Sequence, residues 1–262
     1  MIDLRGVISR NEGRNDHYLD LESVRDRIDE VSRMNLLAVA LRINSPGGSP
    51  GQSELIYRYL LEKIPEGTPV FGFVEDIAAS GGYMVACAAD EIFALETSLV
   101  GSIGVMRASF GFHQLITTLG IERRIQMVGK NKVKGDSFLP RTEEDDAVIA
   151  RVQRAIYDPF VKIVKDSRGG RLAPQENPEE TLFNGEIWAG QGAFQLGLVD
   201  GLGSLESILA HKFGEVEILY PKEKKPGYLD LLFGSKSDTK VDLLDQIETR
   251  LHIASVWGGW RM

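Results

Sequence analysis

The sequence predicts an α/β protein, a layered fold of repeated strand and helix units around a mostly parallel sheet. The first observation is that short apolar runs alternate with amphipathic segments along the chain. The second is that the run at 35–45 is almost uninterrupted by polar residues, which is typical of a parallel strand covered on both faces. With 262 residues, 43% of them apolar, the chain can enclose a sizeable core in one large domain or two small ones.

The first half of the chain alternates regularly between the two kinds of segment. We expect strands over 2–9, 35–45 and 70–74, and helices over 21–34 and 52–63. The first helix has apolar residues at three- and four-residue steps, which places them on one face. These residues are Leu21, Val24, Ile28 and Val31.

The alternation continues through the second half. We expect strands over 91–96, 99–105 and 122–128, and a helix over 113–120. A longer helix begins after Thr142, which caps a strongly acidic first turn. The residues of this helix that we expect to face inward are Val148, Val152, Ile156 and Phe160.

Two domain regions are expected. Residues 1–215 form the α/β domain, and residues 216–262 form a C-terminal extension with a helical tail. The extension serves either as an oligomer contact or as a flexible tail.

Composition disfavours several classes of partner. The net charge of −8 and the pI near 5.2 argue against a nucleic-acid surface. The single cysteine, Cys87, cannot form an internal disulfide and is interpreted as a buried packing residue. The sequence has no His/Cys cluster, no P-loop and no dinucleotide-binding glycine motif, so we expect no metal and no cofactor.

No apolar run reaches the roughly 18 residues needed to cross a bilayer, and the first residues contain no apolar signal core. We therefore expect a chain without its own membrane anchor, which is either cytoplasmic or the excised soluble domain of a longer protein.

Two glycine-containing loops follow consecutive predicted strands. They read INSPGG at 43–48 and ASGG at 79–82, and open α/β sheets usually place their sites at this edge. Ser80 in the second loop can expose its hydroxyl as a nucleophile. The amide of Gly81, with that of Gly47 or Gly48, can hold an oxyanion. The alternatives are an ordinary Pro-Gly turn and a serine that only caps a helix.

A serine nucleophile needs a base to accept its proton. The four histidines lie outside glycine-rich and strand-end contexts: His17, His113, His211 and His252. Lysine is the other option, and it must lose its proton through burial or a nearby positive charge. Three lysines follow the predicted strand at 122–128: Lys130, Lys132 and Lys134. The alternative interpretation of this cluster is a solvated basic loop.

Five motifs in order resemble the signal peptide peptidase A family of serine proteases, including its shorter SohB-like members. The motifs are INSPGG, AASGGYMVACAAD, GSIGV, GKNKVKG and GLVDGLGS. The resemblance extends from the first strand to about residue 213 and implies the ClpP/crotonase fold.

The resemblance also implies a Ser-Lys dyad. Ser80 would attack a peptide carbonyl, and Lys132, in the G-x-x-K context of the family, would take its proton, with Lys130 and Lys134 as alternatives. Ser102 matches the family serine that hydrogen-bonds the lysine. The oxyanion donors correspond to the amides of Gly81 and of Gly47 or Gly48.

Further expectations concern substrate and assembly. The resemblance implies cleavage of hydrophobic peptides, such as signal-peptide remnants or membrane-protein fragments, by a homo-oligomeric ring in which adjacent subunits share each site. The family is usually anchored to a membrane and faces away from the cytoplasm, so membrane association is compatible with this chain although it has no anchor of its own. The substrate backbone is expected to bind by strand addition.

Three alternatives remain at this point. One is a non-catalytic ring that holds a membrane partner. Another is a crotonase-type acyl-CoA enzyme, which would need catalytic carboxylates, but Glu75 and Asp76 lack the usual glycine-rich signature. A Ser-His-Asp triad is disfavoured because His113 lies in a different context from Ser80.

Overall fold

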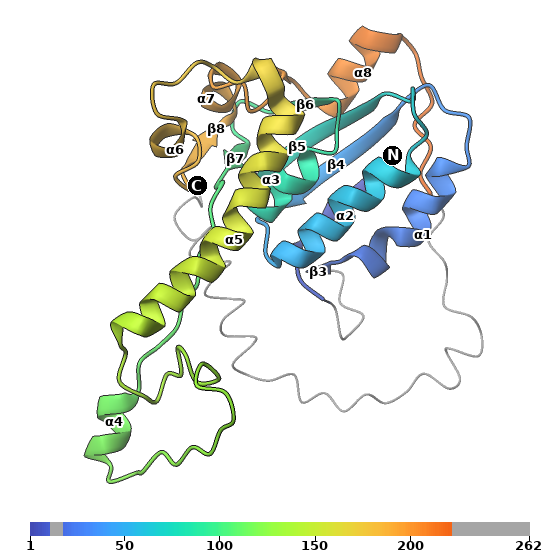
Figure 1. The fold of residues 1–262 in the computed structure, drawn as a ribbon. Coiled ribbons are helices and arrows are strands. Elements are labelled where there is room, and N and C mark those ends of the chain that lie inside the picture. Colours follow the sequence, from blue (N-terminus) through green and yellow to red (C-terminus); the bar gives the residue numbers. More distant parts are fainter. Residues whose placement is uncertain (11–17, 222–262) are drawn as a thin grey trace, which may run out of the picture.

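The computed structural model describes residues 1–10 and 18–221, and the predicted tail beyond residue 221 lies outside them. A seven-stranded sheet forms the centre of the molecule (Figure 1). Its main path runs β1 (Ile2–Arg5), β4 (Val39–Ser45), β5 (Val70–Ala79), β6 (Glu91–Ala94) and β9 (Gly201–Leu202), all parallel. The predicted α/β class is therefore confirmed.

Three further pairings complete the strands of the described residues. β7 (Leu99–Gly101) pairs in parallel with the end of β5, and β8 (Ile187–Ala189) pairs antiparallel with β7. β2 (Val7–Ile8) and β3 (Tyr18–Leu19) form a separate two-stranded sheet. Ile8 also bridges to Gly48, which ties the small sheet to the loop after β4.

Helices cover the sheet on both faces (Figure 1). One face is covered by α1 (Leu21–Ser32), α2 (Pro50–Lys63), α3 (Gly81–Ala86) and the C-terminal half of α5 (Glu143–Arg168). The other face is covered by α8 (Leu205–Phe213). The shorter helices are α4 (His113–Thr118), a 3-10 turn (Gly169–Arg171), α6 (Pro178–Thr181) and α7 (Gly190–Gln195).

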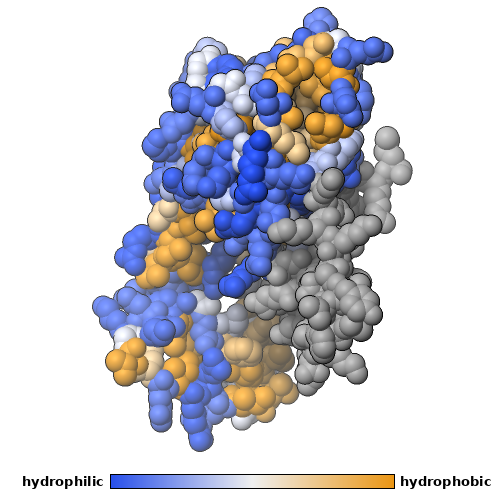
Figure 2. Space-filling model, turned by 90° about the vertical axis from the view of Figure 1, so that its right-hand side faces the viewer, coloured by the Kyte–Doolittle hydropathy of each residue, from blue (hydrophilic) through white to orange (hydrophobic). Residues whose placement is uncertain are grey.

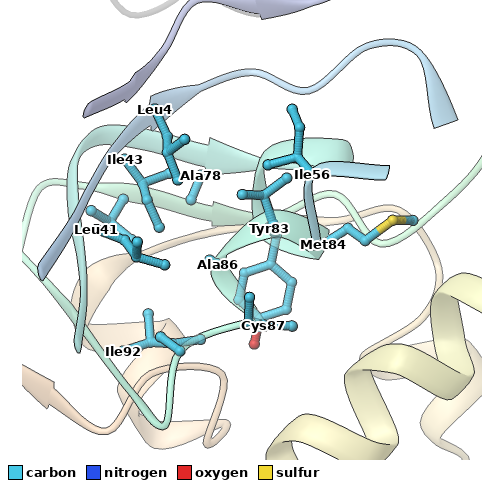
Figure 3. Packing of buried hydrophobic residues seen from close by; sticks show 14 of the residues in the cluster. Leu4, Leu41, Ile43, Ile56, Ala78, Tyr83, Met84, Ala86, Cys87 and Ile92 are labelled. Atoms are coloured by element: carbon cyan, nitrogen blue, oxygen red, sulfur yellow. The ribbon is translucent and has the colours of Figure 1, made fainter. Parts of the chain in front are cut away.

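The apolar strands follow the alternation that a sheet covered on both faces requires. Leu41 and Ile43 of β4 pack into the main core with α2 and α3, as Figure 3 shows. Phe71 and Phe73 of β5 point to the other face and pack with Leu209 of α8. Cys87 lies in the main core, where burial raises the pKa of its thiol to about 12, so the expected packing role is confirmed.

The expected strand over 122–128 is wrong. These residues form no strand, and Val128 is 97% exposed. They belong to residues 105–141, here called the arm, which contains α4. The arm projects away from the sheet beyond the N-terminal end of α5 (Figure 1). Only three of residues 122–128 are apolar, namely Ile125, Met127 and Val128. A segment also needs a neighbouring strand to become part of a sheet, and no strand of the described residues pairs with this one.

The prediction for the long helix, that four of its apolar residues face inward, is partly wrong. α5 begins after Thr142, which forms the predicted cap as part of a capping box. Phe160 is buried as expected, but Val152 is 52% exposed, and Val148 and Ile156 are only half-buried. The N-terminal half of α5 extends past the sheet toward the arm, so this part of its apolar stripe lies outside the core (Figure 1).

A charged pair is buried where α5 ends. The side chain of Arg168 is 0% exposed, and its Nη1 donates to Asp200 Oδ2 at 2.8 Å. Burial alone would raise the pKa of Asp200. The hydrogen bonds from Arg168 and from the Ile92 amide outweigh burial, so the pKa is lowered. This stabilisation is complete above the pKa of an unfolded aspartate, about 3.9, and is lost as the pH falls through the lower folded pKa.

We expect Asp200→Ala to lower the free energy of unfolding by about 3 kcal/mol at neutral pH, because it leaves a buried guanidinium without its partner. Urea denaturation measures this change. The control is Asp166→Ala, which removes an exposed pair with Lys162 and should leave stability nearly unchanged. Equal effects of the two substitutions would contradict the assignment.

Candidate active site

Three strand ends meet at one edge of the sheet. Ser45 at the end of β4 pairs with Ala78 of β5, and Ala79 pairs with Gly101 at the end of β7. Ser80 and Ser102 are the residues that directly follow this last pair, so they leave the sheet side by side. The structure therefore brings Ser80 and the glycine loop after β4 together, as the sequence predicts for parallel strands. Ser102 joins them because β7 ends at Gly101 and not at the expected residue 105, and a place for Ser102 at this site was implied only by the family resemblance.

Ser80 has an unusual backbone conformation. Its φ is 51° and its ψ is −123°, a region that non-glycine residues rarely adopt and that costs of order 1–3 kcal/mol. Its N–H donates to the Gly101 carbonyl at 2.8 Å. Although Ser80 stands at the N-cap position of α3, its side chain makes no capping hydrogen bond. The interpretation of Ser80 as a capping residue only is therefore wrong, and its half-buried hydroxyl is free of that role.

Ser102 also has a backbone conformation with positive φ. Its φ is also 51°, and its N–H donates to the Glu186 carbonyl at 2.6 Å. The indole of Trp188 packs against the preceding Gly101, where a built Cβ would meet the ring at 2.7 Å. Glu186 and the adjoining strand β8 therefore fix the turn at Ser102 and the Gly101 carbonyl that accepts from the Ser80 amide.

The glycine loops come into close contact. A Cβ built on Gly81 would lie 3.5 Å from the Gly48 nitrogen, and one on Gly47 would lie 2.7 Å from the Gly81 nitrogen. The Gly47 N–H donates to Ser45 Oγ at 3.2 Å, whereas no hydrogen bond among the described residues uses the amides of Gly48 and Gly81. Of the two alternatives for the second donor, this geometry favours Gly48.

Gly47→Ala should destabilise the protein by about 3 kcal/mol, because the new Cβ would meet the Ala79 carbonyl oxygen at 2.6 Å with φ at +92°. Gly67→Ala is the matched control. Gly67 has φ +85° but nothing within 4 Å, so alanine there adds only backbone strain of about 1 kcal/mol. Chemical denaturation should therefore separate the two variants, and equal midpoints would show that the loops are not in tight contact.

Ser45 is a residue that the sequence reasoning missed. Its buried Oγ accepts from the Gly47 amide and donates to the Gly6 carbonyl at 2.7 Å, so it fixes the loop that leads to Gly48. The available signal was a small polar residue at the end of an otherwise apolar strand.

The three candidate lysines all lie in the arm. Lys134 Nζ donates to Glu144 at 2.7 Å and lies 3.6 Å from Asp145, and the hydrogen bond to Glu144 raises the pKa of Lys134. Lys130 and Lys132 are exposed, and no hydrogen bond or ion pair with another described residue is formed by the side chain of Lys132. Since the arm projects away from the sheet, one copy of the chain does not bring these lysines to Ser80 (Figure 1).

The arm is also rich in exposed apolar side chains. Figure 2 shows hydrophobic surface at the lower end of the molecule, where the arm lies in Figure 1. Its exposed large apolar residues are Met106, Phe110, Leu115, Leu119, Ile121, Met127, Val128 and Phe138. A cavity of about 320 Å³ lies between the arm and the start of α5, and Phe110, Lys134 and Ile149 are among its lining residues. Ser80 is not one of them.

Other chemistries find little support at this edge. Glu75 lies near Arg5 and Arg42, and Asp76 accepts from Asn44 at 2.7 Å, so both carboxylates belong to polar contacts along the sheet. Within residues 1–10 and 18–221, no three His, Cys, Asp or Glu side chains are grouped as metal ligands. In the same part of the chain, no helix combines the length and the apolar character needed to span a membrane.

Comparison with known proteins gives relatives of several names. A Brucella abortus protein named Na(+)/H(+) antiporter NhaA is 49% identical over 179 residues, which are 68% of this chain and 24% of that protein. The chloroplastic serine protease SPPA of Arabidopsis thaliana is 33% identical over 66% of this chain and 25% of its own length. Protease 4 of Haemophilus influenzae is 36% identical over 64% of this chain and 26% of its own length. The chain thus spans about a quarter of each of these relatives.

The family comparison covers the part of the site that lies after residue 62. The model of peptidase family S49 matches residues 62–218, which is more than half of the chain and contains Ser80, Ser102 and the whole arm. Together with the parallel sheet and the strand-end serines, this match shows that the chain belongs to peptidase family S49 and has the ClpP-like fold of that family.

Proposed function

We propose that this chain is a serine endopeptidase that uses Ser80 as its nucleophile and a lysine as its base. The observation that supports this most is the conformation of Ser80. It is a strained, half-buried serine without a capping bond, and it directly precedes Gly81, whose amide, like that of Gly48, is used by no hydrogen bond among the described residues. Strain of this kind is concentrated at sites where the backbone must present a reactive group.

The proposed reaction follows from this arrangement. Ser80 Oγ bonds to the carbonyl carbon of the peptide while its proton passes to a neutral lysine Nζ. The amides of Gly48 and Gly81 donate to the oxyanion of the tetrahedral intermediate. The lysine then gives its proton to the amine nitrogen as the peptide C–N bond breaks, which leaves an ester on Ser80. A water molecule hydrolyses this ester by the same steps and releases the Ser80 hydroxyl.

Lys132 is the base that we propose, supplied by the arm of a second copy. The raised pKa of Lys134 favours its charged form, whereas Lys132 has no carboxylate partner among the described residues. Burial of Lys132 against a neighbouring copy would remove water from its amine and lower its pKa, which a lysine base requires. Ser102, beside Ser80, would orient this lysine. The assembly that we propose is a homo-oligomeric ring.

The substrates that we propose are extended, hydrophobic peptides. The exposed apolar side chains of the arm, such as Phe110 and Met127, would border a site formed between two copies. The transport activity in the name of the Brucella abortus relative is not proposed for this chain, because the match covers only 24% of that protein.

A serine-directed fluorophosphonate probe and an apolar fluorogenic peptide test the proposal together. We expect the probe to label the protein at Ser80, located by mass spectrometry, and the peptide to be hydrolysed at a rate that falls as labelling proceeds. Hydrolysis that is unaffected by complete labelling, or labelling elsewhere only, would exclude Ser80 as the nucleophile. A protein that neither reacts nor hydrolyses would favour the non-catalytic scaffold.

A further inference from the structure

The strained conformation of Ser80 needs support from outside its own helix. α3 contains only six residues, and so short a helix is not stable by itself. The Ser80 N–H is held by the Gly101 carbonyl. The Ser80 carbonyl accepts from the amides of Tyr83 and Met84, both at 3.0 Å. The position of Tyr83 therefore decides where one end of the Ser80 peptide unit lies.

Tyr83 is anchored at its other end by a buried hydrogen bond. Its side chain is 0% exposed and projects from α3 into the main core beside Cys87 (Figure 3). The hydroxyl donates to the Leu198 carbonyl at 2.7 Å, across 115 residues of sequence. A buried hydroxyl bound to a carbonyl has one favoured position, because an unmade bond would leave two polar groups without partners.

The carbonyl of Leu198 is itself fixed from both sides. Arg168 Nε donates to the Gly197 carbonyl at 3.0 Å, and Arg168 Nη1 bonds to Asp200. Asp200 Oδ2 also accepts from the Ile92 amide in β6 at 2.7 Å. Residues 197–200 (GLVD) are thus bonded to Arg168 of α5 and to β6 of the sheet. These bonds fix the position of the Leu198 carbonyl.

We propose that Tyr83 is a positioning residue for Ser80, which it holds through the Leu198 carbonyl and the Arg168–Asp200 pair behind it. This inference rests on the proposed function of Ser80. It assigns a role to the GLVDGLGS motif, which the dyad and the oxyanion donors do not use. Tyr83 does not contact the substrate, and it acts only by keeping the start of α3 in place.

Tyr83→Phe tests the inference, because it keeps the ring and removes the hydroxyl. The matched control is Tyr157→Phe, which removes a similar bond from a tyrosine hydroxyl to the Phe183 carbonyl, at 2.6 Å. We expect Tyr83→Phe to lower kcat about tenfold, with little change in KM, and to slow fluorophosphonate labelling by a similar factor. Tyr157→Phe should stay within about twofold of wild type in both, since no reacting group is displaced.

Amide hydrogen exchange provides a readout that does not require activity. In Tyr83→Phe, peptides that cover residues 80–87 should exchange faster than in wild type, and in Tyr157→Phe they should not. Equal kinetic losses in the two variants, or unchanged exchange over residues 80–87 in Tyr83→Phe, would overturn the positioning role. An unreactive wild type would instead overturn the proposed function, and the exchange result would still decide whether Tyr83 holds the start of α3.

Discussion

Ser80→Ala should reduce hydrolysis of an apolar peptide by at least about 1,000-fold, because it removes the hydroxyl that forms the acyl-enzyme in the proposed mechanism. The same change should leave the fold intact. The Ser80 side chain makes no capping bond, and the backbone contacts that hold the residue come from its N–H and its carbonyl, which alanine retains. We therefore expect a free energy of unfolding within about 0.5 kcal/mol of wild type.

Initial rates, urea denaturation and the mass in solution should be measured on the same preparation of this variant. Loss of hydrolysis with unchanged stability and unchanged mass is the expected result. Hydrolysis that persists in Ser80→Ala, after contaminating proteases have been excluded by inhibition, would contradict the serine mechanism.

Lys132→Ala should cause a loss of similar size, since a serine without its base is a weak nucleophile near neutral pH. The controls lie in the same loop. Lys130→Ala changes another exposed lysine, and Lys134→Ala removes the pair with Glu144. Both controls should keep most of the activity. A large loss in Lys130→Ala or Lys134→Ala, with Lys132→Ala active, would move the base to that position.

Mixing the two inactive variants tests whether the site is shared between copies. Ser80→Ala still supplies Lys132, and Lys132→Ala still supplies Ser80. If they are unfolded together and refolded at equal amounts, about a quarter of the shared sites should contain both groups and regain activity. A mixture that stays inactive while forming assemblies of normal mass would show that the base does not come from a neighbour.

The sheet and its helices could be predicted because each is encoded locally. The apolar runs that became β4 and β5 and the periodic helix at Leu21–Ser32 are patterns of neighbouring residues. The meeting of Ser80 and the glycine loop was predictable for the same reason, since parallel strands place their carboxyl ends at one edge. Ser102 fell inside an expected strand over 99–105, and only the family resemblance placed it at the site. The choice of Gly48 over Gly47 depended on Ser45 accepting the Gly47 amide, which no pattern in the sequence shows.

The arm could not be predicted in the same way. Its segment over 122–128 has three apolar residues, Ile125, Met127 and Val128, after three charged ones, and whether such a segment joins a sheet depends on neighbours that lie far away in the sequence. Val152 of α5 illustrates the same limit. Its spacing fits the inward face of a helix, yet it is 52% exposed because that part of α5 extends past the core.

The length of α5 has a consequence for when the enzyme would be active. With 26 residues it spans about 39 Å, and the arm with Lys132 lies at the end opposite Arg168 and the sheet. In the proposed enzyme a dilute, separate copy would hold a nucleophile that has no base, so it would be latent without any propeptide. Specific activity would rise with protein concentration, and dissociation alone would switch the peptidase off.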